Sequence, residues 1–109
     1  MKKGPLAEAQ IVAYLRENGY PHAERRVMGG VNDRGDVAGV PGVVIEIKNQ
    51  AEMKLAAWVD EALREAVPIC GSPQMGVVWH KRRGQSSLGE WYVTMRGSTF
   101  VEMLRETGR

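Results

Sequence analysis

The chain has few of the residues that build disulfide scaffolds, zinc sites or membrane spans. Its 109 residues include one cysteine and two histidines. A single thiol excludes an internal disulfide, and Cys70 with His22 and His80 is too small a set for a structural zinc site. We therefore predict that Cys70 is a structural or loop residue.

Long apolar runs are also absent. None approaches the ~20 residues that cross a bilayer, and no hydrophobic region of a signal peptide follows the opening Met-Lys-Lys-Gly-Pro. We expect a cytoplasmic protein with no membrane contact. Its net charge of +2 is too weak by itself to indicate nucleic acid, so the distribution of the charges matters more. The length and the ordinary composition predict a single domain over residues 1–109.

The periodicity of apolar residues predicts an α/β fold with a mixed sheet flanked by helices. We expect the order helix, three strands, helix, strand, strand, helix, with the third strand in the middle of the sheet. The crossover helix should lead to a strand parallel to that third strand. The predicted helices cover residues 6–18, 51–66 and 99–106, and the predicted strands outside the segment 34–50 cover 20–28, 74–80 and 91–95.

Three of these elements carry more specific predictions. In the helix 51–66, Trp58 is predicted as a core anchor, while Glu61 and Glu65 fall among the charged residues that fill the remaining surface. The strand 74–80 is apolar on both faces, which is typical of an interior strand. Thr99 and Glu102 have the spacing of a capping box for the last helix.

The segment 34–50 combines strand and turn chemistry with two carboxylates and a lysine. Val43-Val44-Ile45 has strand propensity, and Val40-Pro41-Gly42 is typical of a turn. Glu46 and Lys48 are two residues apart, so a strand places both side chains on one face. We interpret the segment as an active-site hairpin.

Whether the loop of this hairpin has an even or an odd number of residues decides which face of the sheet the side chain of Asp36 occupies. A two-residue turn would set Asp36 opposite Ile47 and direct its side chain away from Glu46. We therefore predict a bulge or an odd loop between residues 35 and 43, where glycines can adopt the required backbone conformation without strain. Asp33 is the rival for the role of Asp36, but it lies among turn-forming residues that favour solvent.

Asp36, Glu46 and Lys48 together favour metal-assisted chemistry. Ionised carboxylates are hard oxygen ligands for Mg²⁺, with Mn²⁺ as a substitute, and the backbone carbonyl of Ile47 is a further candidate ligand. Lys48 would position or activate a water and neutralise charge in the transition state. The simpler alternative is an exposed ion pair between Glu46 and Lys48, worth under ~1 kcal/mol.

Glu8 also has two interpretations. It lies three, four and seven positions before Ile11, Val12 and Leu15, so it heads the apolar stripe of the first helix. It could be an acid in the first turn that complements the helix dipole. Alternatively, its carboxylate points inward, towards the hairpin.

At this point the residues resemble the PD-(D/E)xK nuclease superfamily. Asp36 and Glu46-Ile47-Lys48 match its motif, with Gly35 in place of the proline. The resemblance implies a restriction-endonuclease-like α-β-β-β-α-β core. The opening Lys3-Gly4-Pro5-Leu6-Ala7-Glu8 is similar to that of archaeal-type Holliday junction resolvases, which implies that Glu8 belongs to the active site as a further candidate metal ligand. The segments 58–66 and 77–84 look like those of small phage and actinobacterial resolvase-like proteins.

This resemblance implies a Mg²⁺-dependent endonuclease that acts on DNA in a prokaryotic cell or a phage-infected host. Its expected substrate is a four-way junction or other branched DNA, and two symmetrical nicks imply a homodimer. Gln50 is shared by several nuclease families and could orient a water or a phosphate, or it could simply end the strand. The candidate phosphate contacts are Arg25, Arg26, Arg34, Lys81, Arg82 and Arg83.

Two other functions fit the same pattern. A restriction- or repair-type nuclease would cut linear, flapped or modified DNA as readily as a junction. A catalytically inactive copy of the fold would bind DNA or a partner protein. The presence of Asp36, Glu46 and Lys48 argues against the inactive copy.

Overall fold

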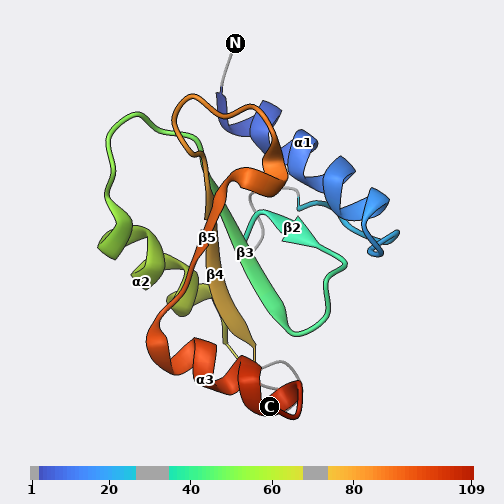
Figure 1. Cartoon of the computed structure of the whole chain (residues 1–109), viewed down its shortest axis with the longest axis vertical. Helices are drawn as coiled ribbons and strands as arrows, with labels where there is room; N and C mark the ends of the chain where they lie inside the picture. The colour runs from blue at the N-terminus through green and yellow to red at the C-terminus, as the bar shows by residue number, and fades with distance from the viewer. Residues whose placement is uncertain (1–2, 27–34, 68–73) are drawn as a thin grey trace.

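Short strands run between two helices in this α/β structure (Figure 1). The computed structural model describes residues 3–26, 35–67 and 74–109, with side chains from Leu6 onward. The order of the elements is the predicted one, with a short 3₁₀ helix before the last strand. The elements are α1 (Lys3–Glu17), β1 (Glu24–Arg25), β2 (Val37–Ala38), β3 (Val43–Lys48), α2 (Leu55–Glu65), β4 (Met75–His80), η1 (Leu88–Glu90), β5 (Tyr92–Thr94) and α3 (Gly97–Glu106).

The described strands form a mixed three-stranded sheet and a separate pair. β3 is parallel to β4, and β5 is antiparallel to β4, which confirms the predicted crossover through α2. β1 and β2 pair with each other. The prediction that β3 lies in the middle was wrong for this three-stranded sheet, whose middle strand is β4. The reason is that β2 does not continue into a ladder with β3.

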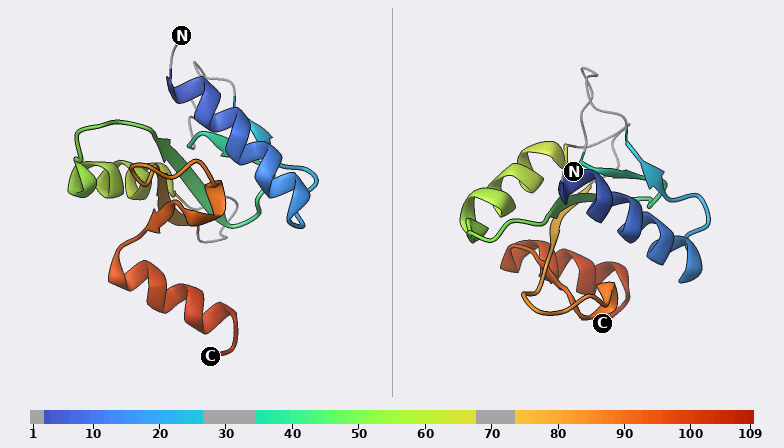
Figure 2. Two further views of the ribbon diagram at one scale, coloured as in Figure 1. Left: turned by 45° about the horizontal axis from the view of Figure 1, so that its top comes forward. Right: turned by 90° about the horizontal axis from the view of Figure 1, so that it is seen from above.

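Helices cover both sides of β3 and β4, with α1 on one side and α2 on the other (Figure 2), and the core lies beneath them. Because side chains alternate along a strand, Ile45 and Ile47 face α1 and pack with its buried Ile11. On the opposite face Trp58 of α2 packs with Val78 of β4. The interior position predicted for β4 is confirmed, and Trp58 is a buried anchor as predicted. Glu46 and Lys48 therefore lie on the α2 face.

Several boundaries differ from those predicted. β1 has only two residues in the described part of the predicted strand 20–28, and α2 begins later than predicted, at Leu55. The capping box was wrong, because α3 already begins at Gly97 and encloses the buried Thr99. Cys70 lies outside the described residues. None of the described helices has the length and apolar character needed to cross a membrane.

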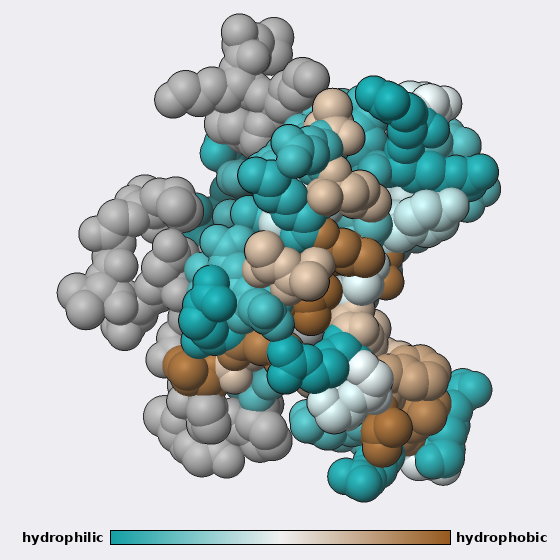
Figure 3. Space-filling view, turned by 90° about the vertical axis from the view of Figure 1, so that its left-hand side faces the viewer, coloured by the Kyte–Doolittle hydropathy of each residue, from teal (hydrophilic) through white to brown (hydrophobic). Residues whose placement is uncertain are grey.

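α3 contributes little to the core. Thr99 is its buried residue, while Phe100 and Val101 are 45% and 43% exposed. Hydrophobic colouring is correspondingly visible on α3 in the lower part of Figure 3. The helices that position the residues around Glu46 are therefore α1 and α2.

The packing of α2 on β4 depends on a glycine, and this generates a prediction. A Cβ added at Gly76 would lie 2.5 Å from the carbonyl oxygen of Ala62, which is rigid backbone of α2. We expect Gly76→Ala to lower the free energy of unfolding by about 1–3 kcal/mol, measured by urea denaturation. Gly97→Ala is the matched control, because a Cβ there meets no atom within 4 Å. Equal losses in both variants, or none at Gly76, would contradict this packing.

Candidate active site

β3 presents Glu46 and Lys48 to α2. The ammonium of Lys48 lies 2.8 Å from a carboxylate oxygen of Glu61. Glu46 is 5% exposed, and its carboxyl shares a hydrogen bond with that of Glu65. The two residues therefore share one face, as their spacing predicts, but the face is covered by a helix. An exposed ion pair between Glu46 and Lys48, the simpler alternative, does not describe this site.

Asp36 reaches the same strand from its other edge. Its backbone N–H donates to the carbonyl of Ile45 over 2.8 Å, and its carboxylate accepts the N–H of Ile47 over 2.7 Å. The carboxylate thus accepts a hydrogen bond that, in a regular sheet, a backbone carbonyl of the neighbouring strand would accept. Gly35, directly before it, has φ +86°, and a Cβ there would lie 2.8 Å from the carbonyl oxygen of Ile45. Glycine is therefore needed for the chain to leave the ladder at this point.

The chain is irregular where a bulge or an odd loop was predicted: three residues, 37–39, separate Asp36 from Val40, whereas Val44 alone separates Val43 from Ile45, so a bulge is present. Asp36 lies opposite Ile45, so residues 37–44 between them are even in number, and a Val40–Val43 turn closes the hairpin with an N–H to C=O distance of 3.4 Å. The predicted bulge is therefore confirmed, although the argument from the number of loop residues assumed a side chain perpendicular to the sheet. The carboxylate lies along the strand edge instead. Asp33, its rival, lies outside the described residues.

The side chains around Glu46 and Lys48 include several carboxyl groups but one ammonium group. Burial raises the pKa of Glu46 to about 10, aided by its hydrogen bond with Glu65 and by the charge of Asp36. Burial also raises the pKa of Asp36 to about 6, although the N–H of Ile47 opposes this shift. Glu46 therefore keeps a proton at neutral pH in the metal-free protein. That proton makes the contact between the carboxyls of Glu46 and Glu65 a hydrogen bond.

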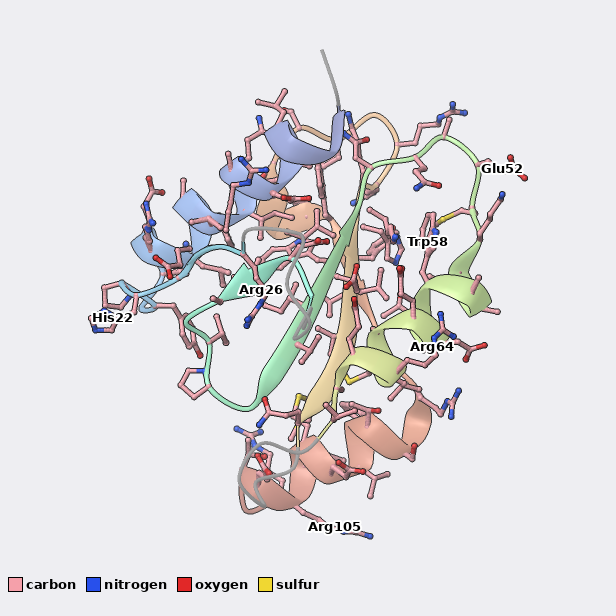
Figure 4. The ribbon with its side chains drawn as sticks, turned by 180° about the vertical axis from the view of Figure 1, so that it is seen from behind. His22, Arg26, Glu52, Trp58, Arg64 and Arg105 are labelled. Carbon is pink, nitrogen blue, oxygen red and sulfur yellow. The ribbon has the colours of Figure 1, made fainter. Side chains whose placement is uncertain are left out.

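Glu61 and Glu65 are the site residues that the sequence interpretation missed. We predicted them on the outer surface of the helix, but both face β3. The signal was present, because Trp58, Glu61, Ala62 and Glu65 follow the spacing i, i+3, i+4 and i+7 that defines one helix face. Trp58 lies on the side of α2 that faces the strands (Figure 4). The two glutamates share that side.

Glu8 lies beside Asp36 rather than beside Glu46. α1 begins at Lys3 and has no acid in its first turn, so the helix-dipole interpretation of Glu8 was wrong. Its carboxylate accepts hydrogen bonds from the guanidinium of Arg25 over 3.1 and 3.2 Å, and its side chain is 17% exposed. Its charge also contributes to the raised pKa of Asp36. Arg25, predicted as a phosphate contact, is thus paired with an acid.

The donors around β3 suit a hard divalent cation with few protein ligands. Among the described residues no group of three or more His, Cys, Asp or Glu side chains is arranged to hold a metal ion. Asp36 and Glu46 offer two carboxylates, within the number that Mg²⁺ takes from proteins. The carbonyl of Ile47 faces the same strand edge as its N–H, which is bonded to Asp36.

A basic groove lies beyond the carboxyl ends of β3 and β4. It encloses about 360 Å³. Its lining residues come from the segments after the two strands and from β5; they are Asn49, Gln50, Ala51, Met53, Lys81, Arg82, Arg83, Gly84 and Tyr92. Gln50 is therefore brought together with the predicted cations of residues 81–83. Arg26 lies apart, with its Nε buried and without a described hydrogen-bond partner, and Arg34 is outside the described residues.

Comparisons with family models, with curated proteins and with solved structures returned no match to this chain. The functional interpretation therefore rests on the arrangement of these residues and on the motif that they form.

The raised pKa of Glu46 predicts how stability depends on pH. The folded protein keeps the Glu46 proton up to about pH 10, whereas the unfolded chain loses it near the ordinary value of 4.5. The contribution of the Glu46 proton to the free energy of unfolding is therefore complete below pH 4.5. It declines as the pH rises from 4.5 to about 10, by up to about 1.4 kcal/mol per pH unit. We expect Glu46→Gln to flatten the decline and to be the more stable protein at pH 8, measured by urea denaturation in EDTA. Parallel pH profiles for the two proteins would contradict this assignment.

Proposed function

We propose that this protein is a metal-dependent endonuclease that hydrolyses phosphodiester bonds in DNA, with a four-way junction as its substrate. The observation that carries the proposal is the convergence of Asp36, Glu46 and Lys48 on β3 from two segments of the chain. The order α1, β1, β2, β3, α2, β4 is consistent with the restriction-endonuclease-like core. A basic groove beside these residues supports an anionic substrate.

The proposed cofactor is Mg²⁺, with Mn²⁺ as a substitute, held by Asp36, Glu46 and the carbonyl of Ile47. When bound, such a cation favours ionisation of water and stabilises charge on a phosphodiester. Glu46 must lose its proton to act as a ligand, and its partner Glu65 lies in place to accept a hydrogen bond or a proton. Glu8, paired with Arg25, would add negative charge beside Asp36 that attracts a cation, rather than bind the cation itself.

Lys48 would act as a fixed positive charge. Burial alone would lower its pKa, but the hydrogen bond and charge of Glu61, with the charges of Glu46 and Asp36, raise the pKa overall. A lysine that stays protonated cannot remove a proton from water. It can orient a water or a phosphate oxygen and stabilise negative charge in the transition state. Glu61 holds the ammonium in position for that role.

The choice of a junction as substrate is supported by the resemblance of the Lys3–Glu8 opening to that of Holliday junction resolvases and by the cations of residues 81–83. A chain with one such site makes one nick, whereas a junction is resolved by two symmetrical nicks. A homodimer with two-fold symmetry would supply both.

Cleavage of a labelled four-way junction tests this proposal. We expect paired, symmetric nicks with Mg²⁺ or Mn²⁺ and none with EDTA. Lys48→Ala and Glu46→Ala should each lower the rate by about 100-fold or more, since each removes charge from the reacting centre. Asp60→Asn is the matched control, because Asp60 is an exposed acid of α2 whose partner is Arg96.

Duplex, flap and single-stranded DNA serve as substrate controls. Equal cutting of all of them would contradict the junction specificity and leave a nuclease of another type. No metal-dependent cutting of any substrate would contradict the proposed activity and favour an inactive DNA-binding copy of the fold.

The role of Glu61 generates a separate prediction. Glu61→Gln removes the charge that keeps Lys48 protonated, so the pKa of Lys48 should fall. We expect the cleavage rate of this variant to decline at a lower pH than the rate of the unaltered protein on the alkaline side of its pH profile. Asp60→Asn should leave the profile unchanged. Identical profiles for Glu61→Gln and the unaltered protein would exclude Glu61 as a positioning residue.

A further inference from the structure

The lining of the basic groove contains more than phosphate-binding side chains. Lys81, Arg82 and Arg83 supply positive charge, and no carboxylate occurs among its described lining residues. Asn49 and Gln50 add two amides, which can both donate and accept hydrogen bonds. A ligand that suits this lining has an anionic group and a polar edge.

An exposed aromatic ring completes the groove. Tyr92 is 52% exposed, although its ring packs edge-on against the ring of His80 with the centroids 6.1 Å apart. His80 is itself 2% exposed, and its Nε2 lies 2.7 Å from the hydroxyl of Thr94. A buried and hydrogen-bonded ring therefore supports Tyr92 from beneath. The part of Tyr92 that remains exposed is a rigid apolar surface.

The cations of the groove are positioned by rings. The guanidinium of Arg82 lies 5.7 Å from the centroid of Tyr92, and the ammonium of Lys81 lies 6.0 Å from that of Trp91. Trp91 is held in turn by a hydrogen bond from its Nε1 to the carbonyl of Gln85. In the described parts of the chain the ion pairs involve other cations. The positive charge of the groove thus remains available to a ligand.

The groove adjoins the candidate active site. Gln50 follows Lys48 by two residues, and the N–H of Lys81 donates to the carbonyl of Lys48 over 3.0 Å. A DNA strand whose scissile phosphate lies at Lys48 would place a neighbouring nucleotide near this groove. Aromatic rings and guanidinium planes are the surfaces on which proteins stack unpaired bases.

We propose that this groove binds one unstacked nucleotide of the DNA, adjacent to the phosphate that is cut. Its base stacks on the pair formed by Tyr92 and Arg82, and its phosphate contacts Lys81 and Arg83. The amides of Asn49 and Gln50 face the edge of the base. This inference rests on the proposed nuclease function for the position of the scissile phosphate. It would account for the proposed preference for branched DNA, because unstacking a base costs less there than in a continuous duplex.

Fluorescence of 2-aminopurine tests the proposal without cleavage. The probe is a single-stranded oligonucleotide with 2-aminopurine at successive positions, titrated with the full chain in EDTA. We expect stacking to quench the fluorescence at one position. Tyr92→Ala should abolish the quenching and weaken binding about tenfold, as loss of one base–aromatic stack does. Tyr92→Phe is the matched control and should preserve both, and thermal unfolding should be similar for all three proteins.

The remaining variants and outcomes separate charge from stacking. Arg82→Lys keeps the charge but loses the planar group, so we expect reduced quenching with a similar salt dependence. Equal quenching by Tyr92→Ala, or no quenching at any position, would overturn the proposal. Competition by free deoxynucleoside monophosphate with the affinity of the oligonucleotide would also overturn it, because the groove would then be a mononucleotide site. Quenching without any Mg²⁺-dependent cleavage would support the groove and reject the nuclease.

Discussion

The interaction on which the site depends is the burial of a carboxyl group, Glu46, between the strand β3 and the helix α2. An ionised carboxylate taken out of water needs a partner, and Glu46 meets other carboxyl groups there. The metal-free protein resolves this conflict with a proton that Glu46 retains and shares with Glu65. A pocket built for stability alone would place an apolar side chain at such a position. Folding stability alone therefore does not account for this acid, and the proposed function assigns it to cation binding.

Asp36 adds a second carboxylate through an unusual use of the sheet. Its side chain replaces a backbone carbonyl at the edge of β3, while its own backbone bonds to Ile45. β2 and β3 therefore form no regular ladder beside Glu46 and Ile47. The carboxylate of Asp36 and the carbonyl of Ile47 share this edge of β3, and the carboxyl of the intervening residue Glu46 lies on the adjoining α2 face. The lack of a regular ladder and the proposed cation site are thus the same structural feature.

Much of the fold was predictable because it depends on local periodicity. The shared face of Glu46 and Lys48 follows from strand alternation, and the buried position of Trp58 follows from helical spacing. The position of Asp36 was not predictable from parity, since a side chain that bonds within the sheet plane ignores the alternation rule. The roles of Glu61 and Glu65 depend on which face of α2 packs on the sheet. Their charge favoured solvent, and the tertiary contact with β3 overrode that preference.

The groove and the candidate active site carry charges of opposite sign. Acidic groups gather on β3 and the inner face of α2, whereas the cations of residues 81–83 lie beyond the strand ends and are supported by aromatic rings. An acidic centre beside a basic groove suits a substrate whose backbone is held by cations and cut beside a metal ion. The two regions are joined through the backbone at Lys48 and Lys81. A strand bound in the groove would therefore be aligned with the carboxylates.

The central claim is that Asp36 and Glu46 form a divalent-cation site whose occupancy displaces a proton from Glu46. Calorimetric titration with Mn²⁺ at neutral pH, in two buffers of different ionisation enthalpy, tests it most directly. The account predicts binding at one site, an apparent enthalpy that differs between the buffers because a proton is released, and loss of both in Glu46→Gln. Binding with the same enthalpy in both buffers, or equal binding by Glu46→Gln, would contradict it.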